Sequence, residues 1–252
     1  MVYFILVMAM QTTTTTTEII YPETDGEPMA SNTQQAEVMM TIKENLDALF
    51  ADRPDVFVAI DHFWYPVEGR PDIRQAPDVM VVIGRPKGHR GSYKQWEEGG
   101  IAPQVVFEVV SPGNPEAEWA QKLEFYERYG VQEYYIYDPD RSEWRGYVRV
   151  GDRLEALGEL EGWVSPLLGV RFGRGCGTDP GLYEPSGRRF VGYVEVRRAL
   201  EAALAREMEA RRLAEEARRR AEQERAQAEE ARRRAERLAQ KLRELGIEPD
   251  EE

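Results

Sequence analysis

Residues 102–139, APQVVFEVVSPGNPEAEWAQKLEFYERYGVQEYYIYDP, decide the fold. The run VVFEVV at 105–110 is apolar and rich in β-branched residues, which is typical of a strand covered on both faces. The SPGNP segment stops this strand, and residues 116–129 predict a helix that ends at Gly130. VQEYYIYD at 131–138 predicts a second strand. A strand, a helix and a strand in this order predict a right-handed crossover between parallel strands, with the helix packed on the sheet.

Charged residues occupy apolar surroundings in and near this stretch. Glu108 lies in the middle of the first strand, where a lone buried carboxylate is costly unless it is paired, protonated or bound to a metal. Asp78 opens another apolar strand, expected over residues 76–83. Lys122 lies at the border of the apolar face of the predicted helix. Two acids and an inward-facing lysine make one possible site.

Plainer interpretations exist for two of these three residues. Glu118 and Lys122 are spaced i, i+4 in the favourable order, so Lys122 could form a surface ion pair worth only a few tenths of a kcal/mol. Spacing alone does not decide whether Lys122 forms this surface pair or belongs to the site with the two acids. Asp78 follows a proline and could be a turn or strand-start residue. Glu108 is harder to explain in this way, because nothing in its strand can pair with it.

The order of these motifs resembles a known family. It consists of PD before an apolar strand, then EVVSP at 108–112, then KLEFYERYGVQEYYIYDP at 122–139. This combination is similar to the Uma-type restriction endonucleases, a branch of the PD-(D/E)XK nuclease superfamily, over about residues 20–175. The resemblance implies an α/β fold, a restriction-endonuclease-like mixed sheet flanked by helices.

The resemblance also implies roles for the site residues. In the superfamily two carboxylates hold magnesium, and a lysine two residues after the second one attends the attacking water; that position is Val110 here. In this branch the lysine comes from the following helix, where Lys122 occupies the matching place. The implied catalytic residues are therefore Asp78, Glu108 and Lys122, and the implied metal ligands are Asp78, Glu108 and the carbonyl of Val109.

The chemistry of such a site follows from its charges. Mg²⁺, with Mn²⁺ as an alternative, prefers oxygen ligands and is commonly held by one or two carboxylates plus a substrate phosphate. A bound ion would activate water and neutralise charge on the phosphate, while Lys122 would orient or deprotonate that water or stabilise the pentavalent state. The resemblance therefore implies a metal-dependent endonuclease that hydrolyses DNA. The alternatives are an idle nuclease-fold interaction module and a structural oligomeriser in which Lys122 neutralises Glu108.

Two further elements could supply supporting groups. An amphipathic helix expected from Ser31 to about residue 50 carries Gln35 and Glu37, which could lend an amide or an acid to the site. Solvent exposure is the favoured interpretation for both. A strand expected over residues 55–65 carries Asp61, a candidate supporting group or further ligand, for which a solvent-facing strand end is the plainer interpretation.

A long loop over residues 84–100 could contact DNA. It carries Lys87, Arg90 and Lys94 and directly follows the strand of Asp78. Long loops in compact domains are usually functional or disordered. The position of this loop predicts a clamp on the phosphate backbone, with a solvated loop as the equal alternative. The two histidines of the chain are too few and too far apart for a zinc centre.

The remainder of the chain divides by composition. Residues 1–30 predict a flexible N-terminal segment and residues 176–190 a linker. Between them, residues 31–175 predict the nuclease-like domain. This domain includes a hairpin that turns at Gly151-Asp152 and a closing strand within 162–172. Residues 191–246 predict a long α-helical coiled coil and 247–252 an acidic tail. The apolar decapeptide 1–10 is too short to span a bilayer and lacks the positive flank of a signal peptide. Lone Cys176 suits a reducing compartment, so we expect a cytoplasmic location.

The C-terminal segment carries a heptad repeat. Apolar residues, mostly alanine, follow the 4,3 spacing from Val196 to Leu245, and only Glu207 and Glu224 interrupt them. Dimerisation of two copies is the expected use, and a solitary charged helix is the alternative.

Residues 1–194 carry a net charge of −12 and residues 195–245 a net charge of +3. An acidic domain is unlike a tight non-specific DNA binder, so local basic patches and metal ions would have to overcome its field.

Overall fold

The computed structural model describes residues 19–24, 26, 29–111 and 116–245. The chain forms two compact units, residues 1–192 and residues 193–252, which are considered separately. The apolar decapeptide and the acidic tail predicted from the sequence lie outside the described residues. No helix in the described part of the chain has the length and apolar content needed to cross a bilayer.

A six-stranded mixed sheet forms the centre of the first unit, in the order β1-β3-β5-β6-β7-β8. β5 and β6 are parallel, and every other neighbouring pair in the sheet is antiparallel. Two short pairs, β2 with β4 and β9 with β10, lie outside it. The strands span β1 Val56–Ile60, β2 Trp64–Tyr65, β3 Val79–Ile83, β4 Tyr93–Lys94, β5 Val105–Val109, β6 Glu133–Asp138, β7 Glu143–Val150, β8 Arg153–Ala156, β9 Arg171–Phe172 and β10 Leu182–Tyr183.

The predicted strand-helix-strand crossover is present. Helix α2 spans Glu116–Tyr129 and connects β5 to the parallel strand β6. Gly130 ends the helix with a φ of 100°, a left-handed conformation that glycine adopts without strain, and the N–H of Val131 donates back to the carbonyl of Tyr126 at 3.0 Å. The turn residue therefore sets the length of the helix.

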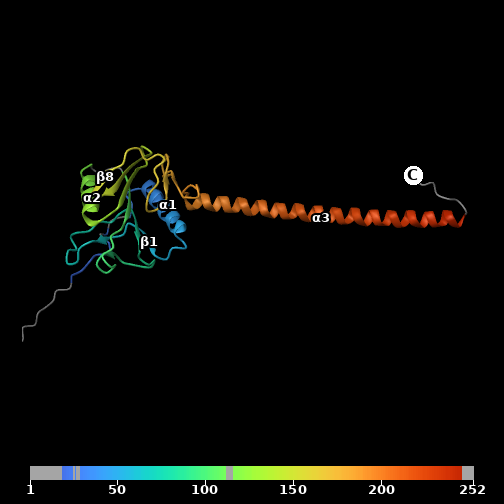
Figure 1. Cartoon of the computed structure of the whole chain (residues 1–252), viewed down its shortest axis with the longest axis horizontal. Coiled ribbons are helices and arrows are strands. Elements are labelled where there is room, and N and C mark those ends of the chain that lie inside the picture. The colour runs from blue at the N-terminus through green and yellow to red at the C-terminus, as the bar shows by residue number, and fades with distance from the viewer. Residues whose placement is uncertain (1–18, 25, 27–28, 112–115, 246–252) are drawn as a thin grey trace, which may run out of the picture. The chain divides into compact units, whose positions relative to one another are not determined.

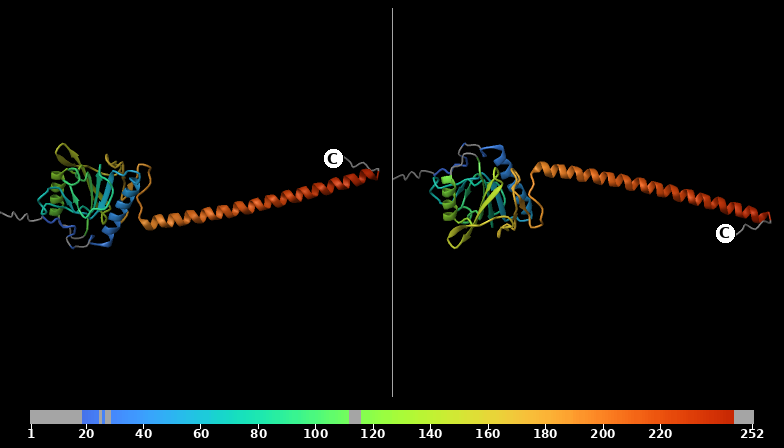
Figure 2. Two further views of the ribbon diagram at one scale, coloured as in Figure 1. Left: turned by 90° about the horizontal axis from the view of Figure 1, so that it is seen from below. Right: turned by 90° about the horizontal axis from the view of Figure 1, so that it is seen from above.

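Two helices cover opposite faces of the sheet (Figure 2). Helix α1, Thr33–Leu49, packs on the face that carries Val105, Phe107 and Val109. Helix α2 packs on the other face, with Val106 and a cluster of buried aromatic residues. Because side chains alternate along a strand, Glu108 points toward α2 rather than α1. The prediction of a strand covered on both faces is confirmed, since every residue of β5 is buried.

Three segments differ from the sequence predictions. The strand expected over residues 55–65 is interrupted at Asp61, whose φ of 42° breaks the extended conformation and separates β1 from β2. In the closing segment only Arg171–Phe172 is a strand, and turns and a bridge make up most of the rest. Part of the expected flexible N-terminal segment is packed, because the hydroxyl of Tyr21 accepts a hydrogen bond from Gly69 N–H at 2.6 Å and its ring contacts Trp96.

The segment 176–190 belongs to the folded unit and is not a linker. Leu182 and Phe190 are buried in the hydrophobic core beside α1, and β10 pairs with β9. The first unit extends to Gly192. Glycine, proline and arginine suggested an extended arm, but the few apolar residues among them are enough to fix the segment on the core.

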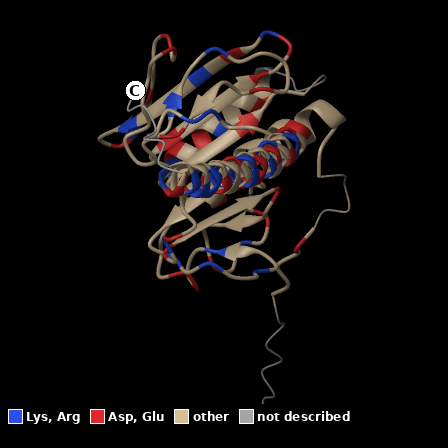
Figure 3. Ribbon diagram, turned by 90° about the vertical axis from the view of Figure 1, so that its right-hand side faces the viewer, with Lys and Arg blue, Asp and Glu red and all other residues tan. Residues whose placement is uncertain are grey.

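Helix α3, Tyr193–Glu244, forms the described part of the second unit as one uninterrupted helix of 52 residues (Figure 1). None of its residues is buried. Basic and acidic residues both occur along the helix (Figure 3). The nine-residue sequence AEEARRRAE occurs at 214–222 and again at 228–236, two heptads later.

Candidate active site

Asp78 lies directly before β3 and contacts the end of β5. Val79 pairs with Phe107 in the antiparallel register, which brings Asp78 beside Glu108 and Val109. The N–H of Val109 donates to Oδ2 of Asp78 at 2.6 Å. Asp78 is 8% exposed, so its carboxylate is largely withdrawn from solvent. It is therefore part of a buried cluster and not a simple turn residue.

Gln35 of α1 holds this carboxylate in place. Its Nε2 lies 3.3 Å from Oδ2 of Asp78 and 3.3 Å from the carbonyl oxygen of Val109. Its Oε1 accepts from the N–H of Ser31 at 2.8 Å, which fixes the orientation of the amide. The expectation that Gln35 faces solvent is wrong, because the first turn of α1 packs against the start of β3 and the end of β5, two interior strands. Glu37 is exposed, as expected.

Glu108 is fully buried and is bound by two side chains of α2. Lys122 Nζ lies 2.8 Å from its Oε2, and the hydroxyl of Tyr126 donates to its Oε1. Lys122 also lies 3.5 Å from Glu118 Oε1 and 5.3 Å from the centre of the Trp119 ring. The surface pair and the inward contact considered from the sequence thus both exist, and the inward contact is the shorter one.

The buried charges shift one another's pKa. Burial, and then the nearby charge of Glu108, raises the pKa of Asp78 to about 8. Burial alone would lower the pKa of Lys122, but the charges of Glu108 and Asp78 outweigh it and raise this pKa above its usual value. With its pKa near 8, Asp78 is largely protonated at neutral pH and the Lys122–Glu108 pair is charge-balanced; ionisation of Asp78 would supply the extra negative charge that a cation needs.

Tyr126 is a site residue that the sequence analysis missed. Its spacing from Trp119 and Leu123 indicates only the apolar face of α2, yet its hydroxyl donates to Glu108 and its ring stacks against Trp64 at 6.4 Å. Burial and the charge of Glu108 raise its pKa, which keeps the hydroxyl a donor. Its position four residues after Lys122, on the same helix face, was the available signal.

The oxygen atoms of this cluster fit a hard divalent cation. Asp78, Glu108 and the carbonyl of Val109 supply carboxylate and backbone oxygens, the ligand types that Mg²⁺ takes while retaining waters. Within the described residues no group of three or more His, Cys, Asp and Glu side chains could hold a metal, so an all-protein cage and a zinc centre are both absent there.

The structure does not bring the other predicted residues to this cluster. Asp61 is exposed, and its backbone N–H lies 3.2 Å from the carbonyl of Asp78. Lys87 Nζ donates to the carbonyl of Phe50 at the end of α1, at 2.7 Å. Lys94 lies 3.3 Å from Glu97 Oε1.

Arg90 makes its contacts within and beside the loop 84–100 rather than with the Asp78 cluster. Its guanidinium covers the ring of Phe57 at 4.2 Å and pairs with Glu98 at 2.6 Å. Phe57 is paired with Val82, near the end of β3 opposite Asp78. The loop follows β3 in sequence, but it starts at the far end of that strand, so sequence proximity to Asp78 was misleading.

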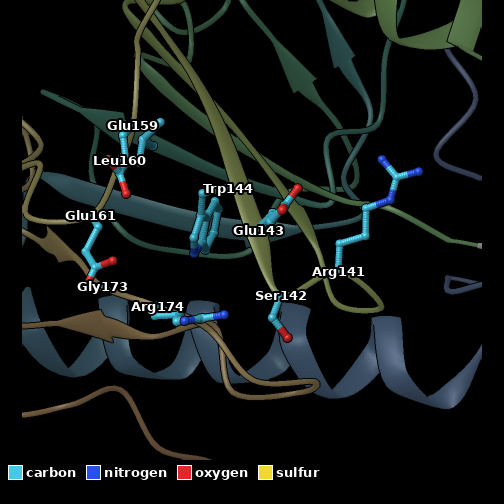
Figure 4. Close-up of a pocket in the computed structure, with 9 residues that line it drawn as sticks. All are labelled: Arg141, Ser142, Glu143, Trp144, Glu159, Leu160, Glu161, Gly173 and Arg174. Carbon is cyan, nitrogen blue, oxygen red and sulfur yellow. The ribbon is translucent and has the colours of Figure 1, made fainter.

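A separate cavity of about 340 Å³ lies around Trp144 (Figure 4). Its charged lining combines Glu143, Glu159 and Glu161 with Arg141 and Arg174. It includes none of the residues of the Asp78 cluster, and the indole N–H of its tryptophan donates internally to the carbonyl of Pro180 at 2.7 Å. The mixed charges favour no single class of ligand.

Comparison with known proteins places this domain. The family model Uma2, described as "Putative restriction endonuclease", matches residues 15–173, more than half of the chain. The chain belongs to the Uma2 family. A crystal structure described as "a putative nuclease belonging to DUF820 from Anabaena variabilis ATCC 29413" is similar to the Uma2 chain at 15% identity, with a TM-score of 0.41, covering 56% of this chain and 74% of that chain. No match was found among curated proteins. The Uma2 match includes Asp78, Glu108 and Lys122.

Proposed function

We propose that this Uma2 domain is a Mg²⁺-dependent endonuclease that hydrolyses phosphodiester bonds of DNA. The observation that carries the proposal is the convergence of Asp78, Glu108, the carbonyl of Val109 and Lys122, from three separate elements, on the end of β5. Family membership supports a nuclease in general terms. Mn²⁺ would fit the same oxygen ligands.

Each residue of the cluster has a task in this proposal. Asp78, Glu108 and the carbonyl of Val109 would hold the ion, which when bound supplies an activated water and neutralises phosphate charge. Gln35 and Tyr126 fix the orientation of the two carboxylates through hydrogen bonds. Lys122 holds a proton beside Glu108, where it can orient the attacking water or stabilise charge on the phosphate.

A second candidate is an interaction module that has kept the nuclease fold without the reaction. The ion pair between Lys122 and Glu108 favours it, because the pair neutralises the buried carboxylate without any metal. The net charge of −12 on residues 1–194 also favours it, since that field repels nucleic acid. A structural oligomeriser would show the same ion pair.

Metal binding separates these candidates. Titration calorimetry with Mg²⁺ and Mn²⁺ on wild type and Glu108→Gln, with nicking of supercoiled plasmid DNA followed in the same buffers, should give binding and cleavage that both disappear in the variant. An Asp78→Ala protein that cuts as well as wild type would contradict the proposal. No metal binding by wild type would instead support the idle module.

Glu133→Gln is the matched control for this experiment. Glu133 lies on the neighbouring strand β6 and is also buried, at 2% exposure. Its carboxylate accepts hydrogen bonds from the Leu167 N–H and the Tyr135 hydroxyl, away from the Asp78 cluster. We expect this variant to keep metal binding and nicking, which would show that loss in Glu108→Gln is not a general effect of removing a buried charge.

A further inference from the structure

Helix α3 carries an interaction surface that the nuclease proposal does not use. Its apolar side chains are exposed at both ends, with Leu200 at 52%, Leu238 at 58% and Leu245 at 74% exposure. These residues and the alanines between them form the heptad seam, the line of a and d positions from Val196 to Leu245. Such a seam is stabilised when a second helix covers it.

The two flanks of this seam carry one sign of charge. With Leu200 at position a, Asp and Glu occupy none of the e and g positions from residue 197 to residue 241. The e flank includes Arg211, Arg218, Arg225 and Arg232. The g flank includes Arg206, Arg220, Arg234 and Lys241. Both flanks are therefore basic, whereas most of the glutamates stand on the outer b and c positions.

Ion pairs within α3 neutralise the outer face but leave the g flank charged. Three arginines at f, Arg212, Arg219 and Arg233, each pair with a glutamate at 2.6 Å. The e arginines Arg211, Arg218 and Arg232 also pair with glutamates of the same helix. Arg206, Arg220 and Arg234 form no ion pair with any residue in the described part of the chain. These three uncompensated positive charges lie beside the seam.

These flanks oppose the pairing of two copies of this helix. In a parallel pair the g position of one helix faces the e position of the other, and in an antiparallel pair like positions face each other. In a parallel pair in register Arg206 would face Arg211 and Arg220 would face Arg225, and no e or g position supplies a carboxylate to offset this repulsion. The homodimer that the heptads alone predict is thus disfavoured, and the alanine-rich middle of the seam buries little area to offset the repulsion.

We infer that α3 pairs with a helix of another protein that has small or apolar residues along its seam and Asp or Glu on both flanks. Such a partner matches the basic e and g positions while its apolar residues cover Leu200 and Leu238. Glu207 and Glu224, which lie within the seam, would each face a Lys or Arg of the partner. Nucleic acid fits less well, because phosphates need no apolar seam and the glutamates at b and c would repel them.

Two synthetic helices test this inference on the full chain. Both have about five heptads with alanine at a and leucine at d; one carries Glu and the other Lys at every e and g position. Fluorescence anisotropy should show binding of the Glu helix, weakening with added salt, and at least about tenfold weaker binding of the Lys helix. Analytical ultracentrifugation should show that the chain alone is a monomer at micromolar concentration.

Two triple variants with the same change in charge locate the surface. Replacing Arg206, Arg220 and Arg234 by Gln should weaken binding of the Glu helix about tenfold, because three modest ion pairs are lost. The matched control replaces the f residues Arg212, Arg219 and Arg233 by Gln and should change the affinity by less than about twofold. Circular dichroism checks that both variants stay helical.

Three results would overturn the inference. The first is a stable homodimer of wild type that survives dilution. The second is equal binding of the Glu and Lys helices, which would mean that the flanks do not select the partner. The third is that the chain binds duplex DNA but neither helix, and that replacing Arg206, Arg220 and Arg234 by Gln weakens the DNA binding. None of these readouts depends on metal or cleavage, so they are independent of the nuclease proposal.

Discussion

Lys122 Nζ lies 2.8 Å from Oε2 of the fully buried Glu108, and this contact joins α2 to β5. Removing the lysine would leave a carboxylate buried without a cation. We expect Lys122→Met to lower the free energy of unfolding of the metal-free protein by about 3–5 kcal/mol, measured by urea denaturation. If the cluster binds Mg²⁺, added magnesium should restore part of that loss through preferential binding to the native state.

The control for this variant is Lys43→Met. Lys43 forms an i, i+4 pair with Asp47 on α1, and both side chains are about one-third exposed. The same chemical change at this surface pair should cost less than about 1 kcal/mol. Equal effects of the two substitutions would show that Lys122 is not needed to compensate Glu108.

Two buried tyrosines provide a second test of the cluster. Tyr126→Phe removes the hydroxyl that donates to Glu108 while keeping the ring, so it should cost about 1.5–3 kcal/mol and weaken Mg²⁺ binding in calorimetry. The hydroxyl of Tyr134 is buried and has no hydrogen-bond partner among the described residues. Tyr134→Phe should therefore leave stability unchanged or raise it. The opposite ranking of the two variants would be inconsistent with Tyr126 as the group that positions Glu108.

Gln35 offers a test from the other face of the sheet. Gln35→Ala removes the amide that contacts Asp78 and the Val109 carbonyl, so we expect a loss of about 2 kcal/mol in stability and a lower affinity for Mg²⁺. The adjacent Gln34 is only half-buried, and Gln34→Ala should stay within about 0.5 kcal/mol of wild type. Unaltered metal affinity in Gln35→Ala would exclude a supporting role for this residue.

His62 predicts a pH dependence of stability outside the cluster. Burial and the charge of Arg90 lower its pKa below the usual value. The unfolded chain therefore binds the proton more readily, and the contribution of His62 to stability is complete above about pH 6.5 and is lost as the pH falls below it. The loss of unfolding free energy between pH 7.5 and pH 5.5 should be smaller in His62→Phe than in wild type. Replacing the exposed His89 by Gln should change this difference only slightly, because its charge makes the smallest contribution to the lowered pKa of His62.

The crossover and the hairpin could be predicted because their signals are local. The apolar run of β5 and Gly130 at the end of α2 each act within a few residues, and the structure agrees with both. The break at Asp61 and the packing of residues 176–190 could not be predicted in this way. Both depend on contacts with distant parts of the chain, such as Phe190 in the core beside α1.

The candidate site was only partly accessible from the sequence. Asp78, Glu108 and Lys122 could be named, and the structure brings them together. The amide of Gln35 reaches Asp78 across 43 positions of sequence, and no local pattern encodes that contact. The loop 84–100 was misplaced for a related reason: adjacency to a strand in sequence does not specify which end of the strand the loop occupies.

The repeat within α3 would allow a partner helix to bind at two positions along its length. A helix aligned with residues 214–222 can also align with 228–236, displaced along the axis by about 21 Å, since each residue of an α-helix rises about 1.5 Å. The two alignments differ where Glu224 in one is replaced by Leu238 in the other. One side chain of the partner, basic or apolar, would therefore select between two docking positions. The repeat therefore gives one partner helix two alternative positions along α3.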